Sequence, residues 1–307
     1  MTSFDSTQPP PPPAPAAGLR EGVARLLQDW SLEATLPKPE EIAALGTQLA
    51  PGTRVYLSAL PHVPWQRLLD AARAVAQAGL EPVPHVAVRN YDSRAELAEF
   101  LAGLREAGGG RRVLAVAGDR ETPRGPFSGS LQLIESGLLQ EAGVGSVDIA
   151  GYPDGHARLS YAELAAALRS KVWAARSAGL QVQVLTQFSF DSKTLLSWLI
   201  QLRYEFPQLP VRVGLAGPAS AGTLFRYALR CGVRTTARGL GRGLRLLGRA
   251  GREQTPLRIV RALAERWTLQ ERGELGLHFY SFGGTARTAA WARALAGGEI
   301  DPERGER

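Results

Sequence analysis

Short apolar runs alternate with longer amphipathic stretches along the chain from residue 19 onward. Each apolar run has the length and the content of branched or aromatic residues that a buried strand needs. Eight such runs are predicted strands: 31–36, 54–60, 81–88, 111–118, 147–153, 181–190, 210–217 and 275–284.

The stretches between these strands carry apolar residues at helical spacing, and several end at glycine, as helices often do. The predicted helices are 38–48, 65–79, 93–108, 160–179, 192–206, 219–232 and 255–267. Eight strands alternating with helices over about 250 residues predict one α/β domain, a (β/α)8 TIM barrel. An open doubly wound sheet is the alternative, but no G-x-G-x-x-G motif follows the first strand.

We expect the barrel to span residues 19–300 and to be catalytic, with a flexible C-terminus at 301–307. Residues 1–18 are rich in proline and have little to bury, so we expect a disordered tail. The single cysteine, Cys231, excludes an intrachain disulfide. The sequence shows neither a signal peptide nor an apolar run of roughly 20 residues, so we expect a cytoplasmic protein without membrane contact.

The formal net charge of +7 comes mainly from arginines between Arg234 and Arg272. Such a surplus is compatible with nucleic acid, with a polyanionic small ligand, or with a solvated basic face. Because no RNA-binding strand motif or helix-turn-helix accompanies these arginines, we expect no nucleic-acid partner.

A (β/α)8 barrel has its active site at the C-terminal ends of its strands. The polar residues inside or just after the predicted strands are Glu33, Ser58, His85, Asp119, Tyr152, Asp154, His156, Thr186, Gln187 and Asp191.

Glu33 is the carboxylate inside an otherwise apolar predicted strand. Burial would raise the pKa of such a carboxyl and suit it to general acid catalysis. A structural pair with a neighbouring arginine is the alternative.

Asp119 follows a glycine at a strand end, where it would lie at the rim of the barrel or cap a helix. Gln187 could hydrogen-bond a heteroaromatic ring or be a satisfied core amide. His85 and His156 could both face the mouth, but no H-E-x-x-H motif is present, so we predict no metal site.

Six segments, in order and on the predicted strands, resemble the methylenetetrahydrofolate reductase family. They are SLEATLPKP (31–39), PHV (84–86), AVAGD (115–119), AGYPDGH (150–156), LTQFSFD (185–191) and HFYSF (278–282).

The resemblance implies that Glu33 protonates the folate as its imidazolidine ring opens and that Asp119 tunes the electrostatics beside the flavin. It also implies that Gln187 and Phe188 contact the folate. The positions that it places along the flavin are Ser58, His85, Asp119, Tyr152, His156 and Lys171.

The implied activity is an oxidoreductase that interconverts 5,10-methylenetetrahydrofolate and 5-methyltetrahydrofolate with NAD(P)H, through bound FAD, in a homo-oligomer. In that case the flavin carries the hydride chemistry and the protein supplies orientation and electrostatics. A barrel that binds folate without turnover, or turns it over without flavin, is the alternative reading.

The chain departs from the family pattern in several places. Gly283 and Gly284 stand where the family has an arginine that meets the folate tail, and Ser130 and Trp173 each replace an aspartate. The arginine-rich stretch 235–252 is then a candidate contact for that tail, or a solvated face.

Overall fold

The computed structural model describes residues 18–230, 253–266 and 273–304. Eight parallel strands close into a barrel in which each strand pairs with its neighbours along the chain and the last pairs with the first. These strands are β1 (Ser31–Ala34), β2 (Arg54–Leu57), β3 (Glu81–Ala87), β4 (Arg112–Val116), β5 (Ser146–Gly151), β6 (Gln181–Thr186), β7 (Val211–Ala216) and β10 (Leu275–Tyr280). The predicted (β/α)8 barrel and its eight strands are therefore confirmed.

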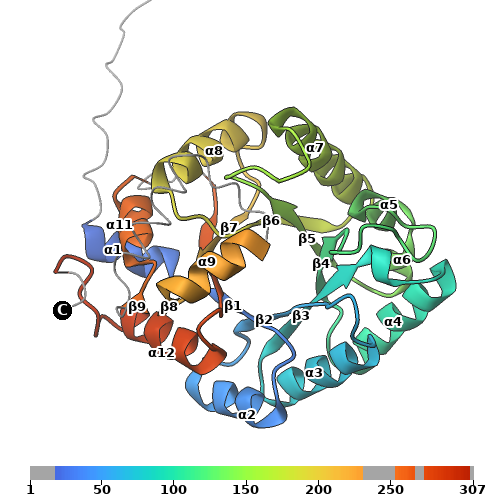
Figure 1. Ribbon diagram of the computed structural model, residues 1–307, viewed down its shortest axis with the longest axis horizontal. Coiled ribbons are helices and arrows are strands. Elements are labelled where there is room, and N and C mark those ends of the chain that lie inside the picture. The colour runs from blue at the N-terminus through green and yellow to red at the C-terminus, as the bar shows by residue number, and fades with distance from the viewer. Residues whose placement is uncertain (1–17, 231–252, 267–272, 305–307) are drawn as a thin grey trace, which may run out of the picture.

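Helices surround the strands, as the view down the barrel in Figure 1 shows. The predicted helices correspond to α2 (Pro39–Gln48), α3 (Gln66–Gln77), α4 (Arg94–Glu106), α7 (Tyr161–Ser177), α8 (Ser192–Glu205), α9 (Ala221–Arg230) and α11 (Leu257–Arg266). The structure adds α1 (Leu19–Leu26), α5 (Ser130–Glu135), α6 (Leu138–Glu141), α12 (Thr285–Ala296) and a short 3-10 helix, Val88–Asn90. Nothing in the described ranges is a helix long and apolar enough to cross a bilayer.

Two segments that follow β7 have different places in the fold. Helix α9 lies inside the ring of outer helices, over the ends of the strands, whereas α11 takes the outer position beside α8 (Figure 1). The two-residue strand β8 (Ala219–Ser220), directly before α9, pairs antiparallel with β9 (Glu253–Gln254), which precedes α11. The arginine-rich stretch 235–252, a candidate contact for the folate tail, lies outside the described residues, as do Cys231 and residues 1–17.

The main core lies between the barrel and its outer helices. Strand residues such as Leu32, Val55 and Val213 are fully buried there against apolar helix residues. Helix α1 packs so closely on α11 that a Cβ at Gly22 would lie 3.0 Å from the carbonyl oxygen of Ala264. Burial of this apolar surface is the main favourable contribution to folding.

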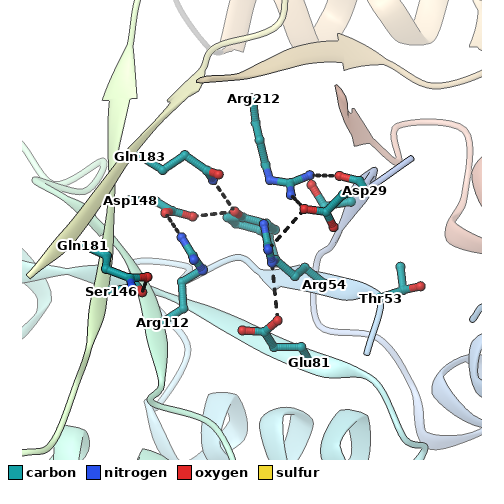
Figure 2. A network of polar contacts seen from close by, with 12 residues as sticks. Asp29, Thr53, Arg54, Glu81, Arg112, Ser146, Asp148, Gln181, Gln183 and Arg212 are labelled. Atoms are coloured by element: carbon teal, nitrogen blue, oxygen red, sulfur yellow. Dashed lines mark hydrogen bonds and ion pairs between the residues drawn. The ribbon is translucent and has the colours of Figure 1, made fainter. Parts of the chain in front are cut away.

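The inside of the barrel is unusually polar near the N-terminal ends of the strands. Barrel interiors are filled mainly by branched aliphatic side chains. Here Asp148 is fully buried, accepts a 2.7 Å hydrogen bond from Nη1 of Arg112, and accepts another from the hydroxyl of Tyr56. Gln183 approaches the same hydroxyl, as Figure 2 shows.

A second part of this network lies at the bottom of the barrel. The guanidinium of Arg212, 2% exposed, donates to the carboxylate and the carbonyl oxygen of Asp29. Arg54 lies 3.2 Å from the same carboxylate and 3.3 Å from Glu81 (Figure 2). Since this end of a barrel is remote from the mouth, we assign the network to stability.

Candidate active site

Glu33 lies at the C-terminal end of β1, with Tyr56 of β2 and Tyr280 of β10 beside it in the register. Its side chain is 14% exposed. The hydroxyl of Ser58 donates a 2.7 Å hydrogen bond to Oε1, and Nε2 of His85 lies 3.6 Å from Oε2. Its contacts are thus a hydroxyl and an imidazole, and not the arginine of the structural alternative.

Burial raises the pKa of the Glu33 carboxyl to about 7. The hydrogen bond from Ser58 opposes this rise, and the negative charge of Asp119 adds to it. Burial also lowers the pKa of His85 to about 4, so the imidazole is neutral at pH 7. Glu33 can therefore hold a proton near neutral pH, as a general acid must.

The stability of the protein should report this raised pKa. A carboxyl with a pKa near 7 when folded and 4.5 when unfolded binds its proton more tightly in the folded state. Its contribution is full below pH 4.5 and is lost as the pH rises through 7. From pH 4.5 to 8, we expect the wild type to lose about 3 kcal/mol of unfolding free energy relative to Glu33→Gln.

Urea unfolding of both proteins at several pH values measures that difference. The effect of His85, whose pKa shift has the opposite sign, is common to both proteins and cancels when they are subtracted. A difference that does not change with pH would show that folding leaves the pKa of Glu33 unshifted.

Asp119 follows β4 after Gly118, whose φ of 96° is a conformation that favours glycine. The next helix, α5, begins at Ser130, so Asp119 does not cap a helix. Its carboxylate is exposed at the rim, and its charge adds to the effect of burial, which is the main cause of the raised pKa of both Glu33 and Tyr152. The charge of Asp119 thus affects the pKa of one residue on β1 and of another just after β5.

Tyr152 and His156 follow β5, and their rings meet edge to face with centroids 5.4 Å apart. Nδ1 of His156 accepts a 3.2 Å hydrogen bond from the backbone N–H of Arg158. Lys171 comes from α7 rather than from a strand end, and partial burial lowers the pKa of its amine. These three predicted cofactor-binding residues thus all come after β5: two lie in the loop that follows it and one lies on helix α7.

Gln187 directly follows β6, and its backbone N–H donates to the carbonyl of Gly151. Its side-chain Oε1 accepts a 3.0 Å hydrogen bond from the backbone N–H of Phe188. The ring of Phe188 is fully buried among Phe190, Tyr280 and Phe282. In this structure Phe188 therefore orients Gln187 through its backbone, and a contact of its ring with folate stays a prediction.

The aromatic cluster around Phe188 extends toward the helix over the mouth. Phe282 stacks on Tyr227 of α9, with ring centroids 4.1 Å apart. The hydroxyl of Tyr280 donates a 3.1 Å hydrogen bond to the carbonyl of Thr186. This cluster borders the mouth on the side of β6 and β10.

A cleft of about 330 Å³ opens on the opposite side, over the loops that follow β1 to β4. Ser58 links this cleft to Glu33, and polar lining is supplied by Asn90 and Arg120. Leu36 also lines it and has a φ of 45°, which is uncommon for a residue other than glycine and costs about 1 kcal/mol. Backbone strain of this kind often accompanies functional sites.

Other candidates from the sequence have structural roles. Asp191 caps α8 by accepting a hydrogen bond from the backbone N–H of Lys193, and Thr186 accepts one from Gly214.

Steric and backbone constraints explain why Gly283 and Gly284 stand where the family has an arginine. A Cβ at Gly283 would lie 2.0 Å from the carbonyl oxygen of Pro218, and Gly284 has a φ of 109°. An arginine cannot stand at Gly283 in this structure unless the backbone moves.

Sequence reasoning missed several polar residues that lie in or beside the barrel interior. Thr35 lies within hydrogen-bonding distance of Ser58, and fully buried His278 contacts Ser31 through Nδ1 at 3.0 Å. Ser31 and Glu33 stand two residues apart, as do Tyr56 and Ser58. Because alternate strand residues face the same side, this spacing of polar residues could have indicated the barrel interior.

Similar folds are found among solved structures. A putative phosphonomutase from Burkholderia cenocepacia is 13% identical with a TM-score of 0.51, over 92% of this chain and 100% of that one. An uncharacterized protein from Clostridium thermocellum that binds two copies of 5-methyl-5,6,7,8-tetrahydrofolic acid is 10% identical with a TM-score of 0.50, over 91% and 97%. At these identities the likeness shows the fold alone.

A family model for methylenetetrahydrofolate reductase matches residues 67–236. The matched range contains His85, Asp119 and Gln187, whereas Glu33 and Ser58 precede it. Because the match covers more than half of the chain, this protein belongs to the methylenetetrahydrofolate reductase family.

Proposed function

We propose that the protein interconverts 5,10-methylenetetrahydrofolate and 5-methyltetrahydrofolate, with NAD(P)H as the reductant and FAD as the bound cofactor. The observation that carries this proposal is the Glu33 carboxyl. It lies at the barrel mouth, is held by Ser58, and is able to keep a proton near neutral pH. Opening of the folate imidazolidine ring needs such a proton on the departing amine nitrogen.

The reaction can be assigned to residues step by step. Glu33 gives its proton to the amine nitrogen as the bond to the bridging methylene carbon breaks. The iminium left on the folate then accepts a hydride at that carbon. Asp119 is exposed at the rim, and its charge contributes to the raised pKa of Glu33. Its carboxylate stabilises the developing positive charge of the folate.

The residues present fit a flavin. Nε2 of His85 is buried without a hydrogen-bond partner, and a ring edge at the mouth could supply one. Tyr152 and His156 would line the ring, and the amine of Lys171 would meet the phosphates. When bound, FAD supplies transfer of hydride from NAD(P)H to the folate.

The same fold is compatible with folate as a ligand. The Clostridium thermocellum barrel binds 5-methyl-5,6,7,8-tetrahydrofolic acid. In the present chain Gly283 leaves no room for an arginine toward the folate tail, so we propose that the tail is held by other residues. The missing arginine also favours the alternative, a barrel that binds folate without turnover.

The visible absorption spectrum of the purified protein, before and after incubation with FAD, tests the proposal. We expect flavin peaks that bleach when NAD(P)H is added and recover when methylenetetrahydrofolate is added. A protein that takes up no FAD but still oxidises NAD(P)H with folate would be a flavin-independent reductase. Absence of both flavin uptake and folate turnover would reject the enzymatic proposal in favour of a binding barrel.

A further inference from the structure

Three side chains form a continuous chain of hydrogen bonds from the surface to the buried carboxyl. Oγ1 of Thr35 lies 2.9 Å from Oγ of Ser58, and Oγ of Ser58 lies 2.7 Å from Oε1 of Glu33. Thr35 is exposed, whereas Ser58 is 8% exposed and the Glu33 side chain 14%. Solvent thus reaches one end of the chain and the catalytic carboxyl forms the other.

The direction of these hydrogen bonds follows from the number of protons. Ser58 has one hydroxyl proton, and it uses this proton in the hydrogen bond to Glu33 when the carboxyl is ionised. Thr35 must then donate to Ser58, which leaves the oxygen of Thr35 to accept from solvent. When Glu33 is protonated on Oε1, all of these bonds can reverse, so the chain is able to conduct a proton.

The other groups around Glu33 are less suited to deliver a proton. The hydroxyl of Tyr56 is engaged by Asp148, and that of Tyr280 by the carbonyl of Thr186. His85 faces the second carboxyl oxygen but is neutral at pH 7, because burial lowers its pKa to about 4. Asp119, on the loop after β4, is exposed at the rim that the substrate would cover.

The backbone holds the two hydroxyl residues in place. The N–H of Ser58 donates to the carbonyl of Ala34, which directly precedes Thr35. The left-handed conformation of Leu36 then turns the chain away immediately after Thr35. The two hydroxyls are therefore positioned by strand pairing and by the turn, rather than by mobile side chains alone.

We propose that Thr35 and Ser58 relay protons from solvent to Glu33 between turnovers, while ligands cover the mouth. After Glu33 has given its proton to the folate amine, the Ser58 hydroxyl proton passes to Oε1 and the Thr35 proton passes to Ser58. Thr35 then takes up one proton from bulk solvent, the proton that each turnover consumes, so that each oxygen of the relay ends with the protons it began with. This relay rests on the proposed reductase function.

The variants Thr35→Val and Thr35→Ser test the relay, because valine keeps the shape of threonine and serine keeps the hydroxyl. Thr47→Val is the matched control, since Thr47 is exposed on α2 and bonds only within its own helix. Steady-state folate turnover and a single turnover started at pH 6 from protonated enzyme are compared. We expect Thr35→Val to lower kcat about tenfold with a larger solvent deuterium isotope effect.

The single turnover should be unchanged in Thr35→Val, because Glu33 already holds its proton, and Thr35→Ser and Thr47→Val should match the wild type in both assays. Equal kcat in Thr35→Val and the wild type would overturn the relay. Equal loss in single and multiple turnover would also overturn it, because a structural role for Thr35 would explain that result.

A wild type without folate turnover would reject the proposed function but not the relay. In that case the infrared band of the Glu33 carboxyl, identified by its absence in Glu33→Gln, is followed after a rapid drop in pH. Slower protonation in Thr35→Val than in Thr35→Ser supports the relay, and equal rates overturn it.

Discussion

Glu33→Gln is expected to lower folate turnover by about 10²–10⁴-fold, which is the usual contribution of a general acid. Glutamine keeps the size of the side chain and can still accept the hydrogen bond from Ser58. It has no acidic proton to give to the departing amine nitrogen, so ring opening loses its catalyst. Oxidation of NAD(P)H by an artificial electron acceptor needs no such proton and should remain largely intact.

Stopped-flow absorbance of the two half-reactions measures this separation. Glu99→Gln is the matched control, because Glu99 is exposed on α4 and removal of its charge should change neither half-reaction by more than about twofold. Equal loss of both half-reactions in Glu33→Gln would show that Glu33 maintains the site rather than donating the proton.

Asp148→Ala is expected to lower the free energy of unfolding by about 3–5 kcal/mol. The carboxylate is fully buried between Arg112 and the hydroxyl of Tyr56. Its removal leaves a largely buried guanidinium without its negative partner and a buried hydroxyl without its acceptor. Asp148→Asn, which keeps a hydrogen-bond acceptor but not the charge, should fall between the wild type and alanine.

Urea unfolding followed by circular dichroism measures these differences. Asp70→Ala is the matched control, since Asp70 pairs with Arg73 on an exposed helix face and its side chain is 67% exposed. That substitution should cost less than about 1 kcal/mol. A similarly small loss in Asp148→Ala would mean that water or a rearranged neighbour replaces the carboxylate.

The alternation of strands and helices could be predicted from the sequence for a simple physical reason. Strands of a parallel barrel are covered by helices outside and by one another inside, so they appear as nearly continuous apolar runs. Helix α12 was missed because its many alanines mark the buried face only weakly. Helices α5 and α6 were missed because they have six and four residues, too few to show a helical period.

The site was predictable only in part. Sequence alone indicated that Glu33, His85 and Asp119 lie at strand ends that converge on the mouth. It could not show that Ser58, implied by resemblance to lie near a flavin, donates a hydrogen bond to Glu33. It also could not show that α9 lies over the strands instead of in the outer ring (Figure 1).

By itself, therefore, the sequence determined the barrel, the order of its strands and the end at which its candidate catalytic residues lie, because these depend on local periodicity and chain direction. Only the tertiary structure decided which side chains meet. Tyr56 and Asp148 are 92 residues apart, and their contact depends on the register of every strand between them. The pKa of Glu33 was likewise decided by burial, which exists only once the ring of strands has closed.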